Sequence, residues 1–211
     1  MTNQIYSPAM LKTYEQCRKK FFLHYIRNIF MPQSAILFET GKNIHALAGY
    51  FLSGLDITKF ENSLNPTEIT LWQKLKANEY FNKTPFKTEF QLSFKLENLW
   101  FGGRIDAIVR DGNNYFILDY KTGSAPKNPK YDYQTMVYLL AVDKFLEHYD
   151  NLYFVYISLK DEENIVINSS KKLLQEYEAK LINTGTKIST MTENNLPTYK
   201  NCKCEYAKIC F

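Results

Sequence analysis

The chain has 211 residues, of which 45% are hydrophobic, and a formal net charge of +4 at pH 7. This size and composition suffice for one substantial core. The mild charge excludes a polybasic protein that coats nucleic acid, but it leaves room for a basic groove. The N-terminus has no signal-peptide pattern, and no apolar segment reaches the roughly 18 residues of a membrane helix. We therefore expect one cytoplasmic domain over residues 1–211, without a membrane partner.

The N-terminal part predicts two helices. Ser7 and Pro8 are typical of a helix start, and apolar residues from 9 to 27 follow at helical spacing. Residues 40–54 predict a second amphipathic helix, which carries His45. A single His on a helix is more often a packed or surface residue than a ligand, so the spacing alone leaves its role open.

Residues 103–123 predict a β-hairpin. Two runs rich in β-branched and aromatic residues flank the turn signal at residues 111–114. If the turn is symmetric, Asp106 lies opposite Asp119, and Lys121 shares their face because side chains alternate along a strand. Two facing carboxylates repel each other unless a cation lies between them. A solvated face fits less well, because both carboxylates lie within apolar runs, so we predict a divalent metal beside Lys121.

The rest of the chain predicts further helices and strands around this hairpin. A strand over Phe86–Trp100 leads into it, and Glu89 near the start of this strand is either an edge charge or a residue of the site. The other expected elements are a helix near 71–80, a helix over Tyr131–Leu146, strands over Leu152–Leu159 and Asn164–Asn168, and a helix over Lys171–Asn183.

The stretch from Gly103 to Asp106, followed by Asp119 to Gly123, resembles the active-site core of the PD-(D/E)XK nuclease superfamily, in particular its RecB-like and Cas4-like branch. Gly41 to His45 is similar to the Gly-x-x-x-His motif of that branch. Gln134 and Tyr138 are similar to its Gln-x-x-x-Tyr motif. The resemblance implies an α/β (α+β) fold, with a restriction-endonuclease-like core in which helices flank a central mixed β-sheet.

The resemblance also implies roles for the site residues. The ligands that it implies for Mg²⁺ or Mn²⁺ are His45, Asp106, Asp119 and the backbone carbonyl of Tyr120. The catalytic residues that it implies are Asp106, Asp119, Lys121, Gln134 and Tyr138. Within this set, Lys121 is expected to orient the attacking water and to offset charge on the phosphate, while Gln134 and Tyr138 are expected to position the substrate.

Four cysteines stand near the two ends of the chain: Cys17, Cys202, Cys204 and Cys210. Intracellular proteins rarely keep disulfides, so this grouping favours metal binding. Four thiolates suit zinc or an iron–sulfur cluster, and their spacing does not decide between the two. The similarity to iron–sulfur nucleases of the Cas4 and AddB type implies a [4Fe–4S] cluster that joins residues of about 7–30 and 196–211. One residue separates Cys202 from Cys204, where the family usually has two.

These implications predict a metal-dependent exonuclease that hydrolyses single-stranded DNA, or DNA with single-stranded ends. Oligomers and protein partners in recombination or CRISPR adaptation are compatible with the prediction. The main alternative is a catalytically silent DNA-binding or assembly subunit of such a complex. An iron–sulfur redox or sensor protein is a third hypothesis.

Overall fold

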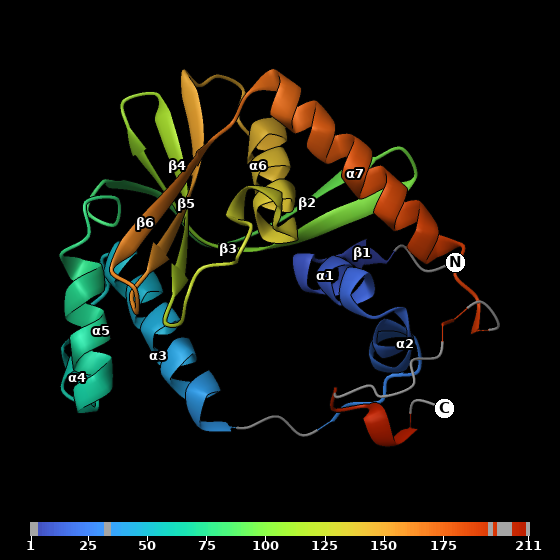
Figure 1. Cartoon of the computed structure of the whole chain (residues 1–211). Coiled ribbons are helices and arrows are strands. Elements are labelled where there is room, and N and C mark those ends of the chain that lie inside the picture. The colour runs from blue at the N-terminus through green and yellow to red at the C-terminus, as the bar shows by residue number, and fades with distance from the viewer. Residues whose placement is uncertain (1–3, 32–34, 194–195, 198–203, 210–211) are drawn as a thin grey trace.

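The structure is a computed structural model that describes residues 4–31, 35–193, 196–197 and 204–209. Figure 1 labels its elements. The strands are β1 (Ile5–Tyr6), β2 (Thr84–Leu96), β3 (Leu99–Asp111), β4 (Asn114–Lys121), β5 (Asn151–Ser158) and β6 (Glu163–Asn168). The α-helices are α1 (Pro8–Gln16), α2 (Arg18–Phe21), α3 (Ala35–Leu52), α4 (Thr58–Glu61), α5 (Pro66–Lys76), α6 (Tyr133–Phe145) and α7 (Lys171–Ser189).

The strands form one mixed sheet in the order β1-β3-β4-β5-β6, and β2 also pairs with β3. The β1–β3 and β4–β5 pairs are parallel, and the others are antiparallel. The predicted hairpin register is confirmed from Ala107 opposite Leu118 to Asp111 opposite Asn114. Gly112 has φ 59 in the connecting turn, a backbone conformation that glycine adopts without steric cost.

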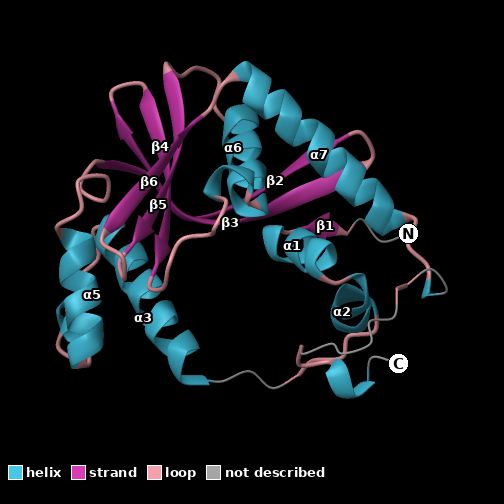
Figure 2. Cartoon of the chain, in the orientation of Figure 1, coloured by secondary structure: helices cyan, strands magenta, loops and turns pink. Residues whose placement is uncertain are grey.

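Helices cover both faces of the sheet (Figure 2). On one face, α1, α6 and α7 pack on the sheet around a core that includes Phe101, Ile117 and Phe154. On the other face, α3 and α5 bury Ile44, Leu47 and Trp72 against the strands. The expected mixed sheet with flanking helices is confirmed, and it fixes the positions of α3 and α6 on opposite faces.

Two expected elements are divided in the structure. The predicted N-terminal helix is interrupted at Cys17, which has the extended values φ −161 and ψ 108 and caps the start of α2. The predicted strand over residues 86–100 was wrong in its extent, because β2 turns back into β3 after Leu96. Glu97 has φ 51 in this turn. Glutamate is an unusual choice for positive φ, so the sequence carries no ordinary turn signal here.

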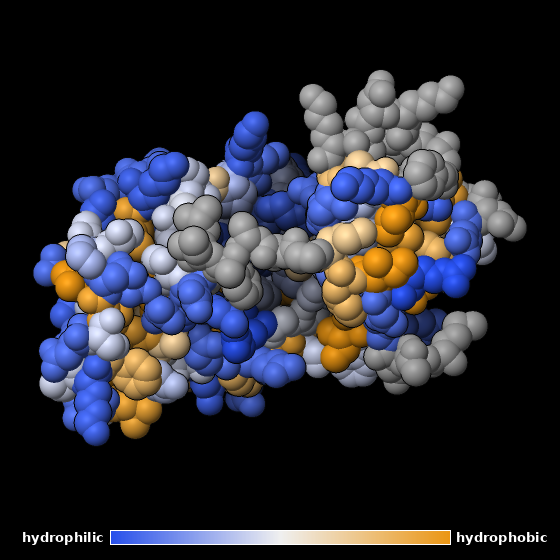
Figure 3. All heavy atoms as spheres, turned by 90° about the horizontal axis from the view of Figure 1, so that it is seen from below, coloured by the Kyte–Doolittle hydropathy of each residue, from blue (hydrophilic) through white to orange (hydrophobic). Residues whose placement is uncertain are grey.

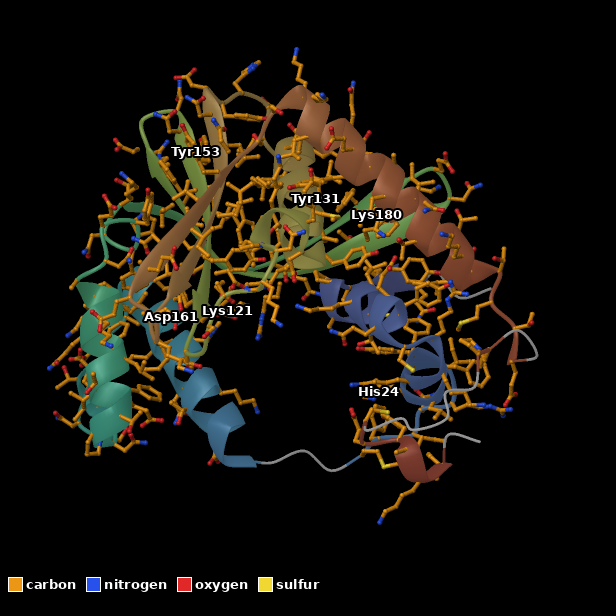
Figure 4. All side chains as sticks on the ribbon, in the orientation of Figure 1. His24, Lys121, Tyr131, Tyr153, Asp161 and Lys180 are labelled. Atoms are coloured by element: carbon orange, nitrogen blue, oxygen red, sulfur yellow. The ribbon has the colours of Figure 1, made fainter. Side chains whose placement is uncertain are left out.

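The two ends of the chain pack against each other. Tyr206, with 1% of its surface exposed, donates a hydrogen bond to the carbonyl of Ile29 at 2.7 Å. His24 Nδ1 lies 2.8 Å from the same hydroxyl, and Figure 4 shows His24 beside the C-terminal segment. Lys20 pairs with Glu205 at 2.9 Å. Within the described ranges, no helix is long and apolar enough to cross a membrane.

Candidate active site

The site lies at a break in the pairing of β3. One edge of β3 pairs with β2 along nearly its whole length. The other edge pairs with β1 at Trp100 and Phe101, and with β4 from Ala107 onward. Between them, residues 102–106 have no strand partner on this edge within the described part of the chain. Backbone groups in such a gap need other partners.

Tyr138 of α6 supplies one of these partners. Its hydroxyl donates a hydrogen bond to the carbonyl of Arg104 at 2.8 Å. Gly103 makes the approach possible, because a Cβ atom there would lie 2.9 Å from the Tyr138 hydroxyl oxygen. Burial raises the pKa of Tyr138, and the charges of Asp119 and Asp106 raise it further. Tyr138 therefore acts as a neutral hydrogen-bond donor that ties α6 to the open edge of β3.

Asp106 fills the end of the gap. Its Oδ2 accepts a hydrogen bond from the backbone amide of Tyr120 at 3.2 Å, and its Oδ1 lies 3.1 Å from His45 Nδ1. In the hairpin register, Asp106 is the next residue opposite Asp119 after the last backbone pair. The Asp106 carboxylate therefore supplies the acceptor for the Tyr120 amide at the point where the two strands separate.

His45 reaches this point from α3. The apolar stripe of Ile44, Leu47 and Ala48 packs α3 on the sheet, which brings the imidazole beside β4. Its Nε2 lies 2.9 Å from the carbonyl of Tyr120, while Nδ1 faces Asp106. Burial opposes its charged form, but the hydrogen bond and the charge of Asp106 outweigh this effect and raise the pKa of His45. Both ring nitrogens face acceptors, so both contacts are satisfied when the imidazole is protonated.

Asp119, Lys121 and Gln134 form a closed group on the other side of Asp106. The Gln134 amide nitrogen donates to Asp119 Oδ1, and its Oε1 accepts from Lys121 Nζ at 3.0 Å. Lys121 Nζ also lies 2.7 Å from Asp119 Oδ2, an ion pair without hydrogen-bond geometry. Asp132 caps α6 by accepting a hydrogen bond from the backbone amide of Gln134 at 3.0 Å. This cap fixes the start of the helix that carries Gln134.

Asp119 is 2% exposed. Burial raises the pKa of Asp119 to about 6, because Lys121 offsets only part of the cost of burying its charge, and the charge of Asp106 adds to this cost. The site thus holds one carboxyl group whose pKa lies well above its ordinary value. Carboxyl groups with a raised pKa are common at cation-binding sites and at sites of proton transfer.

Two cavities meet at this site. One has a volume of about 660 Å³ and is lined by Gly41, Asn43 and Ala46 of α3 and by Glu89 and Thr122. The other has a volume of about 470 Å³ and extends to Lys12 of α1 and to Ser7, which caps this helix. His45 and Arg104 line both cavities. In the view from below, a recess with hydrophilic walls separates the half that holds α3–α5 from the half that holds α2 (Figure 3).

Residues 5–211 match the sequence profile of the PD-(D/E)XK nuclease superfamily. The chain belongs to this superfamily. A solved structure from Eubacterium rectale, named "Putative exonuclease", has a TM-score of 0.56 and 11% identity, covering 95% of this chain and 91% of that chain. A second, that of SSO0001, has a TM-score of 0.40 and 15% identity, covering 96% of this chain and 94% of that chain. No curated protein matches. At these identities the first structure shows a shared fold, while the family match supports a nuclease function.

PD-(D/E)XK nucleases typically use Mg²⁺ or Mn²⁺, and the donor atoms of this site suit such ions. His45 Nε2 and the Tyr120 carbonyl oxygen are 2.9 Å apart. These two atoms share a hydrogen bond here, so the imidazole would have to lose a proton before its nitrogen could hold an ion. Asp119 Oδ2 is buried and accepts no hydrogen bond within the described structure. The residues present therefore fit a divalent ion.

The described residues contain no group of three or more His, Cys, Asp or Glu side chains arranged as a finished metal site. The physical reason lies in the present partners of the carboxylates. Asp106 binds His45 and a backbone amide, and Asp119 is held by Lys121 and Gln134. Metal binding at this point has to exchange some of these contacts for metal–ligand bonds.

The structure brings together all the site residues predicted around the hairpin, which are His45, Asp106, Asp119, Tyr120, Lys121, Gln134 and Tyr138. Gln134 and Tyr138, which are expected to position the substrate, both line the second cavity, and their polar groups already have protein partners. Gln134 contacts Asp119 and Lys121, and Tyr138 contacts the backbone of Arg104. The sequence reasoning did not find the ion pair between Glu89 and Arg104, whose nitrogen and oxygen atoms are 3.0 Å apart.

The predicted cysteine cluster is only partly described. Cys202 and Cys210 lie outside the described residues. Cys17 Sγ accepts from the backbone amide of Lys20 at 3.4 Å. The pKa of the Lys20 ammonium is raised mainly by its hydrogen bond to Glu205, and the nearby charge of Cys204 contributes as well. Cys17 and Cys204, from opposite ends of the chain, thus both lie near Lys20.

Proposed function

We propose that this chain is a Cas4-like, Mg²⁺- or Mn²⁺-dependent deoxyribonuclease that degrades single-stranded DNA from an end. One observation carries the proposal most strongly. Asp106, Asp119 and Lys121 lie together at the separated end of the hairpin, and Asp106 and His45 line the adjoining cavity. The membership in the nuclease superfamily supports this interpretation of the site.

In the proposed mechanism, His45, Asp106, Asp119 and the Tyr120 carbonyl would hold the ion. Such an ion would supply Lewis-acid chemistry, which polarises a phosphate and makes a nearby water more acidic. Lys121 places its ammonium group beside this point, where it orients the attacking water and stabilises negative charge that grows on the phosphate. Gln134 bridges the Lys121 and Asp119 side chains, which keeps the ammonium group of Lys121 aligned beside the carboxylates.

We further propose that residues 1–211 form one domain. A [4Fe–4S] cluster on Cys17, Cys202, Cys204 and Cys210 connects its N-terminal and C-terminal segments. The packing of Tyr206 on the N-terminal helical segment supports such a connection, because it already holds the two chain ends together. The cluster's role is structural, and zinc is the competing occupant. Anaerobic purification followed by iron, sulfide and zinc analysis tests this part separately from nuclease activity. Near-stoichiometric zinc without iron contradicts it.

A digestion series tests the proposed activity. Purified protein is incubated with linear single-stranded, linear duplex and circular single-stranded DNA, with Mn²⁺ or with EDTA. We expect shortening of the linear single strand, little change of the circle, and no cleavage with EDTA. Binding to DNA without cleavage in Mn²⁺ would instead support the silent DNA-binding or assembly subunit. Cleavage of the circle at the same rate would contradict attack from an end.

A further inference from the structure

Glu89 of β2 has an unusual backbone conformation for a residue inside a strand. Its φ is 46, whereas its neighbours Thr88 and Phe90 pair regularly with Ala107 and Ile105 of β3. This register places Glu89 opposite Asp106. A non-glycine residue in the left-handed region costs on the order of 1–3 kcal/mol and persists only where its surroundings fix it. The contacts of the Glu89 side chain therefore have to fix this backbone conformation.

The Glu89 carboxylate holds Arg104. Its Oε2 lies 3.0 Å from Arg104 Nε. Burial raises the pKa of Glu89, and Arg104 partly offsets this effect. Gly49 of α3 leaves room for the Glu89 stem, because a Cβ atom at Gly49 would lie 3.1 Å from Glu89 Cγ. The carboxylate is thus confined between α3 and the β2–β3 pair.

Arg104 is held by one contact to its backbone and one to its side chain, while the end of its guanidinium group stays exposed. The Tyr138 hydroxyl binds its carbonyl, and Glu89 binds its Nε. Its side chain is 69% exposed and lines both cavities where they meet. Among the described residues, the structure shows no hydrogen bond or ion pair to its two terminal guanidinium nitrogens. These nitrogens form the planar pair of donors that binds phosphate oxygens in a bidentate manner.

We propose that Arg104 binds the DNA phosphate adjacent to the scissile one, and that Glu89 is a positioning residue that aims its guanidinium group. The charges at the junction favour this assignment. Asp106, Asp119 and Glu89 all repel a polyanion, and the Lys121 ammonium group is already paired with Asp119, so a strand that crosses the junction gains from a further fixed cation there. An arginine whose side chain is already oriented loses less conformational freedom on binding than a free one. The inference rests on the proposed function, which supplies both the DNA ligand and the position of the scissile phosphate.

Binding measurements test Arg104 without requiring cleavage. The anisotropy of a fluorescent single-stranded oligonucleotide is followed in EDTA across a series of salt concentrations. We expect Arg104→Gln to weaken binding about tenfold or more, as for a lost charge-assisted hydrogen bond. Because one phosphate contact is lost, the slope of log K against log salt becomes shallower by about 0.7. Arg104→Lys keeps the charge but loses the paired donors, so it restores the slope better than the affinity.

Arg110→Gln is the matched control. Arg110 lies on the same strand, is exposed, and lines neither cavity. Its replacement removes the same charge from the chain and should leave the salt slope unchanged. Equal affinity and slope for Arg104→Gln and wild type would overturn the proposal, even if the protein proves to be a nuclease. A protein that binds DNA with the predicted slopes but does not cleave it would refute the proposed function and leave this contact standing.

Glu89→Gln tests the positioning role. It removes a negative charge from the cleft, which favours DNA binding, and it loosens the guanidinium group, which opposes binding, so DNA affinity in EDTA should change little. The value of kcat should fall about tenfold because the guanidinium group loses its alignment. Glu89→Asp should recover part of kcat. In the Arg104→Gln background, Glu89→Gln should have no further effect on kcat, since the two residues act as a unit. A full additional loss in the double variant would show that Glu89 acts independently of Arg104 and would overturn its assignment.

Discussion

The carboxylate of Asp106 accepts a hydrogen bond from the backbone amide of Tyr120 at 3.2 Å, where β3 and β4 separate. The same side chain faces His45 through its other oxygen, at 3.1 Å. One residue therefore supports the backbone at the open end of the hairpin and contributes a charge to the site. These two tasks can be separated by substitution.

Asp106→Asn keeps an oxygen acceptor for the Tyr120 amide but removes the charge. We expect near wild-type stability and at least a roughly hundredfold loss of cleavage rate, comparable to the loss of an electrostatic catalytic group. Asp106→Ala removes both functions and should also cost about 1–3 kcal/mol of unfolding free energy, because the buried amide loses its partner. Initial cleavage rates and urea unfolding measure the two effects. An active Asp106→Asn enzyme would remove this residue from the catalytic site.

Gln134→Glu places a second carboxylate in contact with Asp119. The added negative charge should raise the pKa of Asp119 further, so the acid limb of the pH–rate profile is expected to move upward by about one unit. Gln134→Ala leaves the ion pair of Lys121 and Asp119 but removes the bridge between them, and a loss of about 10–100-fold in rate is expected. Rates measured from pH 5 to pH 9 distinguish these outcomes. An unchanged pH–rate profile in Gln134→Glu would contradict the proposed contact of Gln134 with Asp119 in the active enzyme.

Asp119 should also make the stability of the metal-free protein depend on pH. Its pKa is about 6 in the folded chain, above the usual 3.8, so the folded state binds the extra proton between these values. Wild-type stability relative to Asp119→Asn should therefore fall as pH rises from about 4 to about 6, by up to about 1.4 kcal/mol per unit, and stay level above. Urea unfolding of both proteins in EDTA measures the difference. A wild type that gains relative stability over this range would show the opposite shift.

Gly103→Ala should separate α6 from the open edge of β3. The new methyl group meets the Tyr138 hydroxyl at 2.9 Å, so Tyr138 has to move and the carbonyl of Arg104 loses its donor. A cost of about 1–3 kcal/mol in unfolding free energy is expected. Gly54→Ala is no neutral control because of its φ of 72. Gly123→Ala, which meets open space, provides a better comparison and should change stability little.

The sequence predicted the hairpin and its register because the turn carries an ordinary signal and both strands alternate clearly. The carboxylates and Lys121 followed from that register. The pairing of Glu89 with Arg104 could not be derived, because it depends on the turn between β2 and β3. That turn uses Glu97 at positive φ, where no glycine or proline marks it. The break of the first helix at Cys17 was missed for the same reason, since the apolar spacing continues through it.

The roles of Gln134 and Tyr138 depend on contacts between α6 and the sheet. Their spacing of four residues places them on one helix face, but it does not say which atoms they meet. In the structure, one meets the Asp119–Lys121 pair and the other a backbone carbonyl. Such contacts arise from the packing of α6 across an unpaired strand edge, which no local sequence pattern encodes.

The most direct test of the proposed nuclease site compares wild type with Asp119→Ala and Lys121→Ala on end-labelled single-stranded DNA in Mn²⁺. We expect shortening from the end by the wild type, complete loss of cleavage with EDTA, and no detectable cleavage by either variant at equal fold and iron content. Full cleavage by either variant would contradict the assignment of this site as the catalytic centre.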